Sequence, residues 1–343
     1  MSKICVIGSG SWGTAQAILL SNHNSNVCLW GRLEDGILDM QKTRENRRFL
    51  PGIQIPENIK ISDDIQAVTQ DAELLVLAVP AQVVRKTIKK LKPYLNKKVV
   101  IVNTAKGIEM QTGLRMSEVI SAELGKEFLD RFAVLSGPSH AEEVALEVPT
   151  TVTVAAYRKD IAILVQDTYM NNNFRVYTNP DVAGVELGGA LKNIYALATG
   201  IVDGLGYGDN TKAALITRGL TEMTRMGQVM GGDPRTFSGL SGIGDLIVTC
   251  SSHLSRNRRA GEMLGKGFPL TETLEAVGMV VEGVHTTKIT HNLALKMNVD
   301  MPITKACYNV LYNEKEPGEE LSKIMQRQKK HEMEDNVSDI EDW

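Results

Sequence analysis

Two lysines stand in settings where a cationic side chain could take part in chemistry. Lys192 lies in an apolar helical stretch that contains Gly188 and Gly189, so a ligand can approach this stretch closely. A partly desolvated lysine can donate a proton to a carbonyl oxygen while hydride reaches the carbonyl carbon. Lys106 follows an apolar run, where its ammonium could meet a phosphate or a carbonyl. Each lysine is also compatible with a surface position, in which the stem covers apolar surface and the ammonium stays in water.

A basic cluster and a glycine-rich segment in the second half of the chain add further polar groups. Ser255 is predicted to cap a helix that runs toward Leu264, so a phosphate there would meet helix amides together with Arg256 and Asn257. Asp245 follows a glycine-rich stretch a few residues earlier. The alternative for the cluster is a solvated, charged helix start. Because these polar groups recur close together, we expect them to share a site with Lys192.

A glycine motif near the beginning of the chain predicts a nucleotide site. An apolar run ends in Gly8-Ser9-Gly10-Ser11-Trp12-Gly13, and a helical run follows. In this fingerprint Gly8 permits the tight turn, Gly10 lets a pyrophosphate approach the backbone, and Gly13 allows close packing of the helix. The helix start supplies amide donors and the positive end of a dipole. A glycine-rich turn without a ligand is the alternative, but the strand before the motif and the helix after it favour nucleotide binding.

The residue after the second apolar run bears on the choice of nucleotide. An NAD-selective site usually carries a carboxylate here, about 20 residues beyond the glycines, to accept the ribose hydroxyls. This chain reads Trp30-Gly31-Arg32 at that place. Arg32 can offer a forked guanidinium to a 2'-phosphate, which favours NADPH, although a surface arginine is the alternative.

A loop of small residues follows a later apolar run. It reads Ser136-Gly137-Pro138-Ser139-His140-Ala141, and such a loop can lie against a nicotinamide ring. A plain turn explains the same residues nearly as well.

The elements that would position these residues follow from the hydrophobic pattern. Short runs rich in Val, Ile and Leu alternate with helical stretches up to about Thr178, which predicts a Rossmann-type, mostly parallel sheet domain. The runs are Ile4 to Gly8, Val27 to Trp30, Leu74 to Val79, Val99 to Thr104, Phe132 to Ser136 and Thr151 to Ala155. After Pro180 the apolar spacing is helical and no convincing strand follows, which predicts an all-α C-terminal domain. We expect a dinucleotide-binding domain at 1–184, a substrate domain at 185–330 and a flexible acidic tail at 331–343.

Composition excludes several classes of protein. The 343 residues, with 43% hydrophobic and 23% charged residues, are typical of a soluble enzyme with two domains. A net charge of −3 gives no general attraction to nucleic acid or to anionic membranes. We expect no membrane insertion and a cytoplasmic location, because no charged leader and no long apolar stretch is present. The four cysteines are scattered without metal-binding spacing, so neither disulfides nor a metal site is expected.

Seven motifs, taken together and in this order, resemble the bacterial NAD(P)-dependent glycerol-3-phosphate dehydrogenases, and the resemblance extends from Lys3 to about Gln328. They are Gly8-Ser9-Gly10-Ser11-Trp12-Gly13, Asn103-Thr104-Ala105-Lys106-Gly107, Leu135-Ser136-Gly137-Pro138-Ser139, Gly189-Ala190-Leu191-Lys192-Asn193, Gly242-Ile243-Gly244-Asp245-Leu246, Ser255-Arg256-Asn257 and Val280-Val281-Glu282-Gly283.

The resemblance implies an oxidoreductase that interconverts dihydroxyacetone phosphate and sn-glycerol 3-phosphate with NADP(H) or NAD(H) and supplies glycerol 3-phosphate for phospholipid synthesis. It implies that Lys192 is the catalytic proton donor or acceptor. The substrate would be surrounded by Lys106, Gly137, Ser139, Lys192, Asp245, Ser255, Arg256 and Asn257. Beyond the three fingerprint glycines, cofactor contacts would come from Ser11, Trp12, Arg32, Phe49, Lys106, Ala141, Arg256, Val280 and Glu282. A homodimer formed through the helical domain is a further expectation.

Three other functions fit parts of the pattern. A related β-hydroxyacid or ketopantoate-type reductase shares a Rossmann domain, a helical domain and a lysine-asparagine helix. A sensor that binds NADPH without turnover would need the glycine fingerprint but not Lys106, Lys192 and Asp245. A purely structural oligomer would bind no nucleotide.

Overall fold

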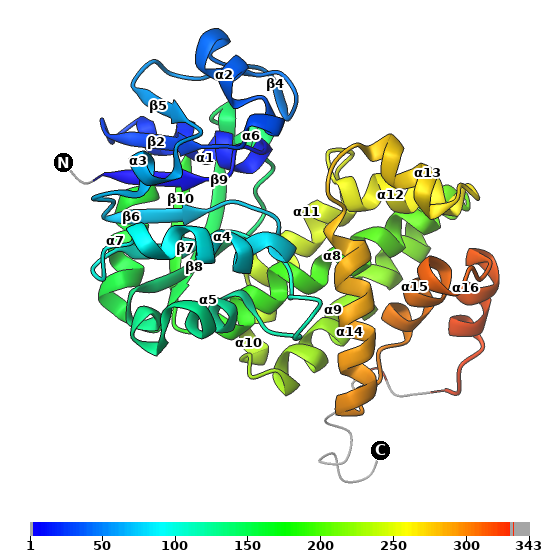
Figure 1. Ribbon diagram of the computed structural model, residues 1–343. Coiled ribbons are helices and arrows are strands. Elements are labelled where there is room, and N and C mark those ends of the chain that lie inside the picture. Colours follow the sequence, from blue (N-terminus) through cyan, green and yellow to red (C-terminus); the bar gives the residue numbers. More distant parts are fainter. Residues whose placement is uncertain (1–2, 330–331, 333–343) are drawn as a thin grey trace.

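The computed structural model describes residues 3–329 and residue 332, and its first half is built on an eight-stranded sheet (Figure 1). The strand order is β10-β9-β8-β7-β6-β1-β2-β5. All neighbours are parallel except β8 and β9, which are antiparallel. The strands are β1 (Ile4–Ile7), β2 (Val27–Trp30), β5 (Ile59–Ser62), β6 (Leu74–Leu77), β7 (Val100–Asn103), β8 (Phe132–Ser136), β9 (Thr150–Ala156) and β10 (Phe174–Asn179).

Helices cover both faces of this sheet, which explains why its central strands are apolar throughout. On β1, Ile4 and Val6 pack in one core with α1 (Ser11–Ser21), α6 (Ala141–Ala145) and α7 (Lys159–Tyr169). The alternate residues Cys5 and Ile7 pack in a second core with α3 (Ile65–Thr69), α4 (Val84–Leu91) and α5 (Met116–Leu124). The Rossmann-type, mostly parallel sheet expected from the sequence is confirmed.

All six predicted strands are present, and the structure adds four. The strands β5 and β10 extend the sheet at its two edges. A separate antiparallel hairpin pairs β3 (Glu45–Asn46) with β4 (Leu50–Gln54), next to α2 (Ile37–Thr43). The edge strands were missed because their outer residues are polar: Lys60 in β5, and Arg175 and Tyr177 in β10, are exposed, so neither strand forms a continuous apolar run.

The second half is helical, as expected, and no strand follows β10 within the described residues. Its central helix, α8, starts at Val182 and is buried along nearly its whole length. It packs against several of the helices that follow it, most closely against α12. The helices are α8 (Val182–Gly204), α9 (Asp209–Val229), α10 (Pro234–Phe237), α11 (Asp245–Ser251), α12 (Arg256–Gly265), α13 (Leu270–Val277), α14 (Glu282–Met297), α15 (Pro302–Tyr312) and α16 (Pro317–Met325). The segment expected as an acidic tail lies outside the described residues except for Glu332.

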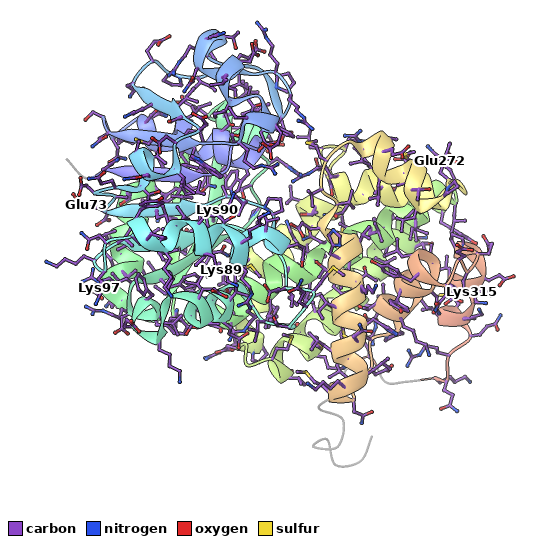
Figure 2. The ribbon with its side chains drawn as sticks, in the orientation of Figure 1. Glu73, Lys89, Lys90, Lys97, Glu272 and Lys315 are labelled. Atoms are coloured by element: carbon purple, nitrogen blue, oxygen red, sulfur yellow. The ribbon has the colours of Figure 1, made fainter. Side chains whose placement is uncertain are left out.

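Charged side chains are spread over the outside of both halves. Figure 2 shows Lys89, Lys90 and Lys97 on the sheet half, and Glu272 and Lys315 on the helical half. The charged groups that matter for chemistry are instead gathered between the halves, where loops at the carboxyl ends of β1, β6, β7 and β8 face α8 and α12. Ligands of open parallel sheets bind at this edge.

Candidate active site

A cleft of about 320 Å³ lies between the sheet half and the helical half. Loops that follow four strands form one wall, through Gly10, Pro80, Lys106 and Ser139. The helical half supplies the other wall, which includes Lys192, Asn193, Thr249, Ser255, Arg256, Asn257, Val280 and Glu282. Most of the residues singled out in the sequence therefore meet in one place.

Two lysines share one carboxylate beside the cleft. Lys106 Nζ donates a hydrogen bond to Asp245 Oδ2 at 2.7 Å and another to the carbonyl of Gly137 at 3.1 Å. Lys192 donates to the other carboxylate oxygen of Asp245, and also to the hydroxyl of Thr249 at 2.8 Å. The Thr249 hydroxyl donates in turn to the backbone carbonyl of Asp245 at 2.6 Å. Asp245 is thus held by both lysines at once and fixes the distance between them.

Burial and ion pairing together shift the pKa values of Lys192 and Asp245. Removal from water lowers the pKa of Lys192 to about 7, the charge of Lys106 lowers it as well, and Asp245 opposes both. Burial alone would raise the pKa of Asp245, but its ion pairs with Lys106 and Lys192 outweigh burial and hold that pKa below its usual value. Lys192 is therefore poised to exchange a proton near neutral pH, beside a carboxylate that stays charged.

Small residues on α8 bring Lys192 to the edge of the sheet. A Cβ atom added at Gly189 would lie 2.7 Å from Ser136 Oγ and 3.5 Å from the stem of Lys106. One added at Gly188 would lie 2.4 Å from the carbonyl oxygen of Ser241. The helix can approach β8 and the segment before α11 only because both positions lack side chains. The sequence analysis expected a ligand to approach these two glycines closely, whereas the structure packs both of them against protein atoms.

The start of α12 forms the polar end of the helical wall. Ser255 caps this helix, because its side chain accepts a hydrogen bond from the amide of Arg258 at 3.3 Å, and the predicted cap is confirmed. Asn257 is buried: its amide nitrogen donates to Asn193 Oδ1 at 2.9 Å, and its carbonyl oxygen accepts from the amide of Gly283 at 2.8 Å. Arg256 is exposed and lines the cleft. Helix amides and a guanidinium together can bind an anion here.

The fingerprint loop has the geometry that a dinucleotide requires. Gly8 has a φ of 118°, in a region that favours glycine, and a Cβ there would lie 2.6 Å from the carbonyl oxygen of Ala78. Gly13 packs against the carbonyl of Gly8, whereas the space around Gly10 is open to 4 Å. The first turn of α1 contains no acidic residue. A pyrophosphate can therefore approach the amides at this helix start without a competing charge.

Three buried polar atoms in the cleft wall lack a hydrogen-bond partner among the described residues. They are Trp12 Nε1, His140 Nε2 and Glu282 Oε2. The other oxygen of Glu282 accepts from the amide of Ala81 at 3.0 Å, which ties α14 to the loop after β6. Buried polar atoms are almost always hydrogen-bonded, so these three fit a wall that contacts a polar ligand. The residues present therefore suit a nicotinamide dinucleotide.

The remaining predicted positions are placed as follows. Ala141 lines the cleft at the start of α6. Ser11 lines it too, and its hydroxyl donates to the carbonyl of Phe49 at 2.6 Å, which attaches the hairpin to α1. Gly137 and Asp245 lie just behind the cleft wall and contact Lys106. Arg32 and Phe49 lie beyond the residues that line the cleft, on the side of the fingerprint loop.

Sequence reasoning missed three polar residues of this site. Thr249 lies one helical turn after Asp245 on α11, so its spacing could have placed it beside Lys192. Asn193 directly follows Lys192, and its position alone indicates no role, although its side chain joins Asn257 to the carbonyl of Lys106. His140 was treated only as part of a loop. Nothing in the sequence signals that its half-buried ring lies near Lys192 and Lys106, where burial, together with the charges of these lysines, lowers the pKa of His140.

Neither a metal-binding cluster nor a membrane-spanning helix is present in the part of the chain that the structure describes. No group of three or more His, Cys, Asp or Glu side chains in that part of the chain is arranged to hold a metal ion. No helix there is both long and apolar enough to cross a membrane.

Comparisons with known proteins agree with this geometry. Residues 3–162 match the model of the NAD-dependent glycerol-3-phosphate dehydrogenase N-terminus, and residues 181–322 match that of its C-terminus. The glycerol-3-phosphate dehydrogenase [NAD(P)+] of Syntrophomonas wolfei is 59% identical over 343 residues, and the alignment covers 100% of both chains. That of Bacillus subtilis is 50% identical over 341 residues, with 99% of each chain covered.

Solved structures give the same result. The crystal structure of glycerol-3-phosphate dehydrogenase from Coxiella burnetii superposes with a TM-score of 0.91 at 38% identity, over 95% of this chain and 99% of that one. A ketopantoate reductase from Ralstonia eutropha shares only the fold, with a TM-score of 0.60 at 14% identity, over 93% of this chain and 99% of the other. The chain belongs to the NAD-dependent glycerol-3-phosphate dehydrogenase family.

Proposed function

We propose that the protein interconverts dihydroxyacetone phosphate and sn-glycerol 3-phosphate with NADPH or NADH. The observation that carries this proposal is the pairing of Lys106 and Lys192 through Asp245 beside a cleft that also holds the start of α12. A fingerprint loop with room for a pyrophosphate lies on the opposite wall. Residues that can hold a redox cofactor, a proton donor and residues that can anchor a phosphate thereby meet at one cleft.

In this proposal Lys192 is the catalytic acid in reduction and the base in oxidation. Bound NAD(P)H supplies the hydride for C2 of the ketone. Lys192 donates its proton to the oxygen at C2, and its pKa of about 7 suits both directions near neutral pH. Asp245 and Thr249 keep the ammonium in place. Lys106 forms an ion pair with the same carboxylate and stabilises negative charge on the substrate.

The substrate phosphate is proposed to bind at the start of α12. Ser255, Arg256 and Asn257 bring helix amides, a guanidinium and a side-chain amide to one end of the cleft. Anchoring the phosphate there holds the carbonyl at a fixed distance from Lys192, so binding energy from a remote group is used for positioning. Gly137 and Ser139 would complete the substrate surroundings from the sheet side, beside Lys106.

The cofactor is proposed to lie across the carboxyl edge of the sheet. Its pyrophosphate would meet the amides that follow Gly10, next to Ser11 and Trp12, and Arg32 and Phe49 would lie at its adenosine end. Ala141, Lys106, Arg256, Val280 and Glu282 line the part of the cleft between the fingerprint loop and Lys192, where the nicotinamide belongs. The unpaired atoms of Trp12 and Glu282 support this placement.

The proposal is tested by mixing purified protein, NADPH and dihydroxyacetone phosphate and following the absorbance of the reduced nicotinamide. We expect NADPH to be oxidised when dihydroxyacetone phosphate is present. Little oxidation is expected with unphosphorylated dihydroxyacetone or with ketopantoate. Faster turnover of ketopantoate would assign the protein to the ketopantoate-type reductases. Tight NADPH binding without turnover of any ketone would identify a sensor.

Three further proposals concern organisation and setting. We propose that residues 1–184 act as the dinucleotide domain and residues 185–330 as the substrate domain.

A homodimer formed through the helical half is supported by strongly exposed apolar residues there, such as Leu295 at 69% and Met325 at 77%, and analytical ultracentrifugation tests it. The four buried free cysteines suit a cytoplasmic location, where the product would feed phospholipid synthesis.

A further inference from the structure

The turn that follows β2 lies directly against the fingerprint loop. A Cβ atom added at Gly31 would be 2.1 Å from the hydroxyl of Ser9, the residue between the first two fingerprint glycines. The amide of Gly31 donates to the carbonyl of Ser62 at 3.2 Å, so β5 supports the turn from the other side. Arg32, the next residue, is therefore held where the adenosine ribose of a bound dinucleotide would lie.

The guanidinium of Arg32 is already occupied by carboxylates of its own turn. Its Nε donates to one oxygen of Asp35 and its Nη2 to the other, both at 2.8 Å. Its Nη1 lies 3.4 Å from a carboxylate oxygen of Glu34. This two-bond arrangement on Asp35 is the same geometry by which an arginine binds a phosphate. A phosphate can therefore take the fork only by displacing Asp35.

Solvent exposure of the arginine limits the cost of that displacement. The side chain of Arg32 is 55% exposed, whereas that of Asp35 is 17% exposed, so the pair is solvated mainly from the arginine side. Solvent screens such a partly exposed pair, and a phosphate carries more charge than a carboxylate. A second arginine, Arg48, is close to the same turn, because its Nη1 donates to the carbonyl of Glu34 at 2.8 Å. Displacement is thus feasible, but it weakens binding of the phosphate by a measurable factor.

We propose that Asp35 determines cofactor specificity by competing with the 2'-phosphate of NADPH for the fork of Arg32. NADH leaves the Arg32–Asp35 pair intact, whereas NADPH has to break it. Asp35 therefore reduces the preference for NADPH over NADH that Arg32 alone would give. The proposal rests on the function proposed above only in taking NAD(P)H as the ligand. It explains how one chain can accept both cofactors with an arginine at this position.

The test compares two nucleotide fragments that differ in the 2'-phosphate and require no turnover. Calorimetry would give the affinities of 2',5'-ADP and 5'-AMP for the parent protein and for Asp35→Asn. Asp35→Asn is expected to tighten 2',5'-ADP about threefold to tenfold and to change 5'-AMP by less than about twofold, because an intramolecular competitor and one negative charge are removed. The catalytic efficiency with NADPH should rise relative to that with NADH by a similar factor.

Asp39→Asn is the matched control, since Asp39 is an exposed carboxylate of the adjoining helix α2 that has no contact with Arg32 and approaches Arg47 at 3.9 Å. Asp39→Asn removes the same charge as Asp35→Asn, and it should change the ratio of the affinities for 2',5'-ADP and 5'-AMP much less. In an Arg32→Ala background, Asp35→Asn should tighten the binding of 2',5'-ADP no more than Asp39→Asn does.

Three results would overturn the proposal: no tightening of 2',5'-ADP by Asp35→Asn, equal tightening by Asp39→Asn, or full tightening without Arg32. Turnover of dihydroxyacetone phosphate with NADH, measured on the same samples, tests the proposed function separately.

Discussion

Lys192 and Asp245 form an ion pair that is almost sealed from solvent, with side-chain exposures of 7% and 1%. They come from different helices, α8 and α11, and are 53 residues apart in sequence. A buried pair of this kind loses hydration, and removal of one partner leaves an uncompensated charge. Here the second oxygen of Asp245 forms an ion pair with Lys106, so the carboxylate has a second partner besides Lys192.

This relationship predicts opposite pH dependences for the two directions of the reaction. Reduction needs Lys192 as the ammonium, so its kcat should fall as the pH rises through about 7, the pKa of Lys192. Oxidation needs the neutral amine, so its kcat should rise over the same interval. Because Asp245 raises the pKa of Lys192, Asp245→Asn should move both profiles to lower pH. Profiles of kcat in both directions test this, and two flat profiles between about pH 6 and 9 would remove Lys192 as the titrating group.

Arg256→Ala is expected to weaken the use of dihydroxyacetone phosphate by about 1.5 to 3 kcal/mol in kcat/KM, the usual range for one charge-assisted contact. Unphosphorylated dihydroxyacetone should be affected little, since it has no group to place at the start of α12. Arg259 provides a matched control, because it is an exposed arginine on the same helix that also lines the cleft. An equal loss with both substrates would show that Arg256 does not contact the phosphate.

The sequence was sufficient to predict elements that are buried on both faces. The central strands β1, β6 and β7 are continuous apolar runs, and each is among the six strands that the sequence predicts. The edge strand β10 was not, because Arg175 and Tyr177 face solvent and break the pattern. The hairpin of β3 and β4 is too short to carry a periodic signal, and its register also shifts between Glu45 and Asn46.

The site was predictable where a residue's role depends on its own element. Ser255 as a cap follows from local sequence. Gly188 and Gly189 signal a close approach in the same way, but only the fold shows that protein segments, and not a ligand, pack against them. The pairing of Lys106 with Asp245 does not, since it joins residues 139 positions apart across the two halves of the molecule. The Arg32–Asp35 contact is local, yet an unpaired arginine fits the sequence equally well. Only the folded structure distinguishes these contacts from exposure of the same side chains to solvent.

Close packing of two helices positions the start of α12, where the phosphate is proposed to bind, and predicts an effect on stability. The helices α8 and α12 approach so closely that a Cβ at Gly261 would lie 2.0 Å from the carbonyl oxygen of Leu197. Gly261→Ala should therefore destabilise the protein by about 1 to 3 kcal/mol or more, as expected for overpacking. Gly208→Ala is the control, because nothing lies within 4 Å of a Cβ at that position. Urea unfolding midpoints measure both, and equal midpoints would contradict the close contact.

The assignment of Lys192 as proton donor makes the most direct prediction. Lys192→Ala should lower kcat for reduction by at least about 100-fold, the lower range for loss of a positioned general acid, while the affinity for NADPH stays nearly unchanged. Lys106 is the competing donor, because it is bound to the same Asp245 and also reaches the cleft. The two differ in that Lys106 is 20% exposed, whereas Lys192 is 7% exposed and has a pKa of about 7. Single-turnover hydride transfer in Lys192→Ala and Lys106→Ala separates them: loss of Lys106 should mainly weaken substrate binding, and hydride transfer at the parental rate without Lys192 would show that the proton comes from another group.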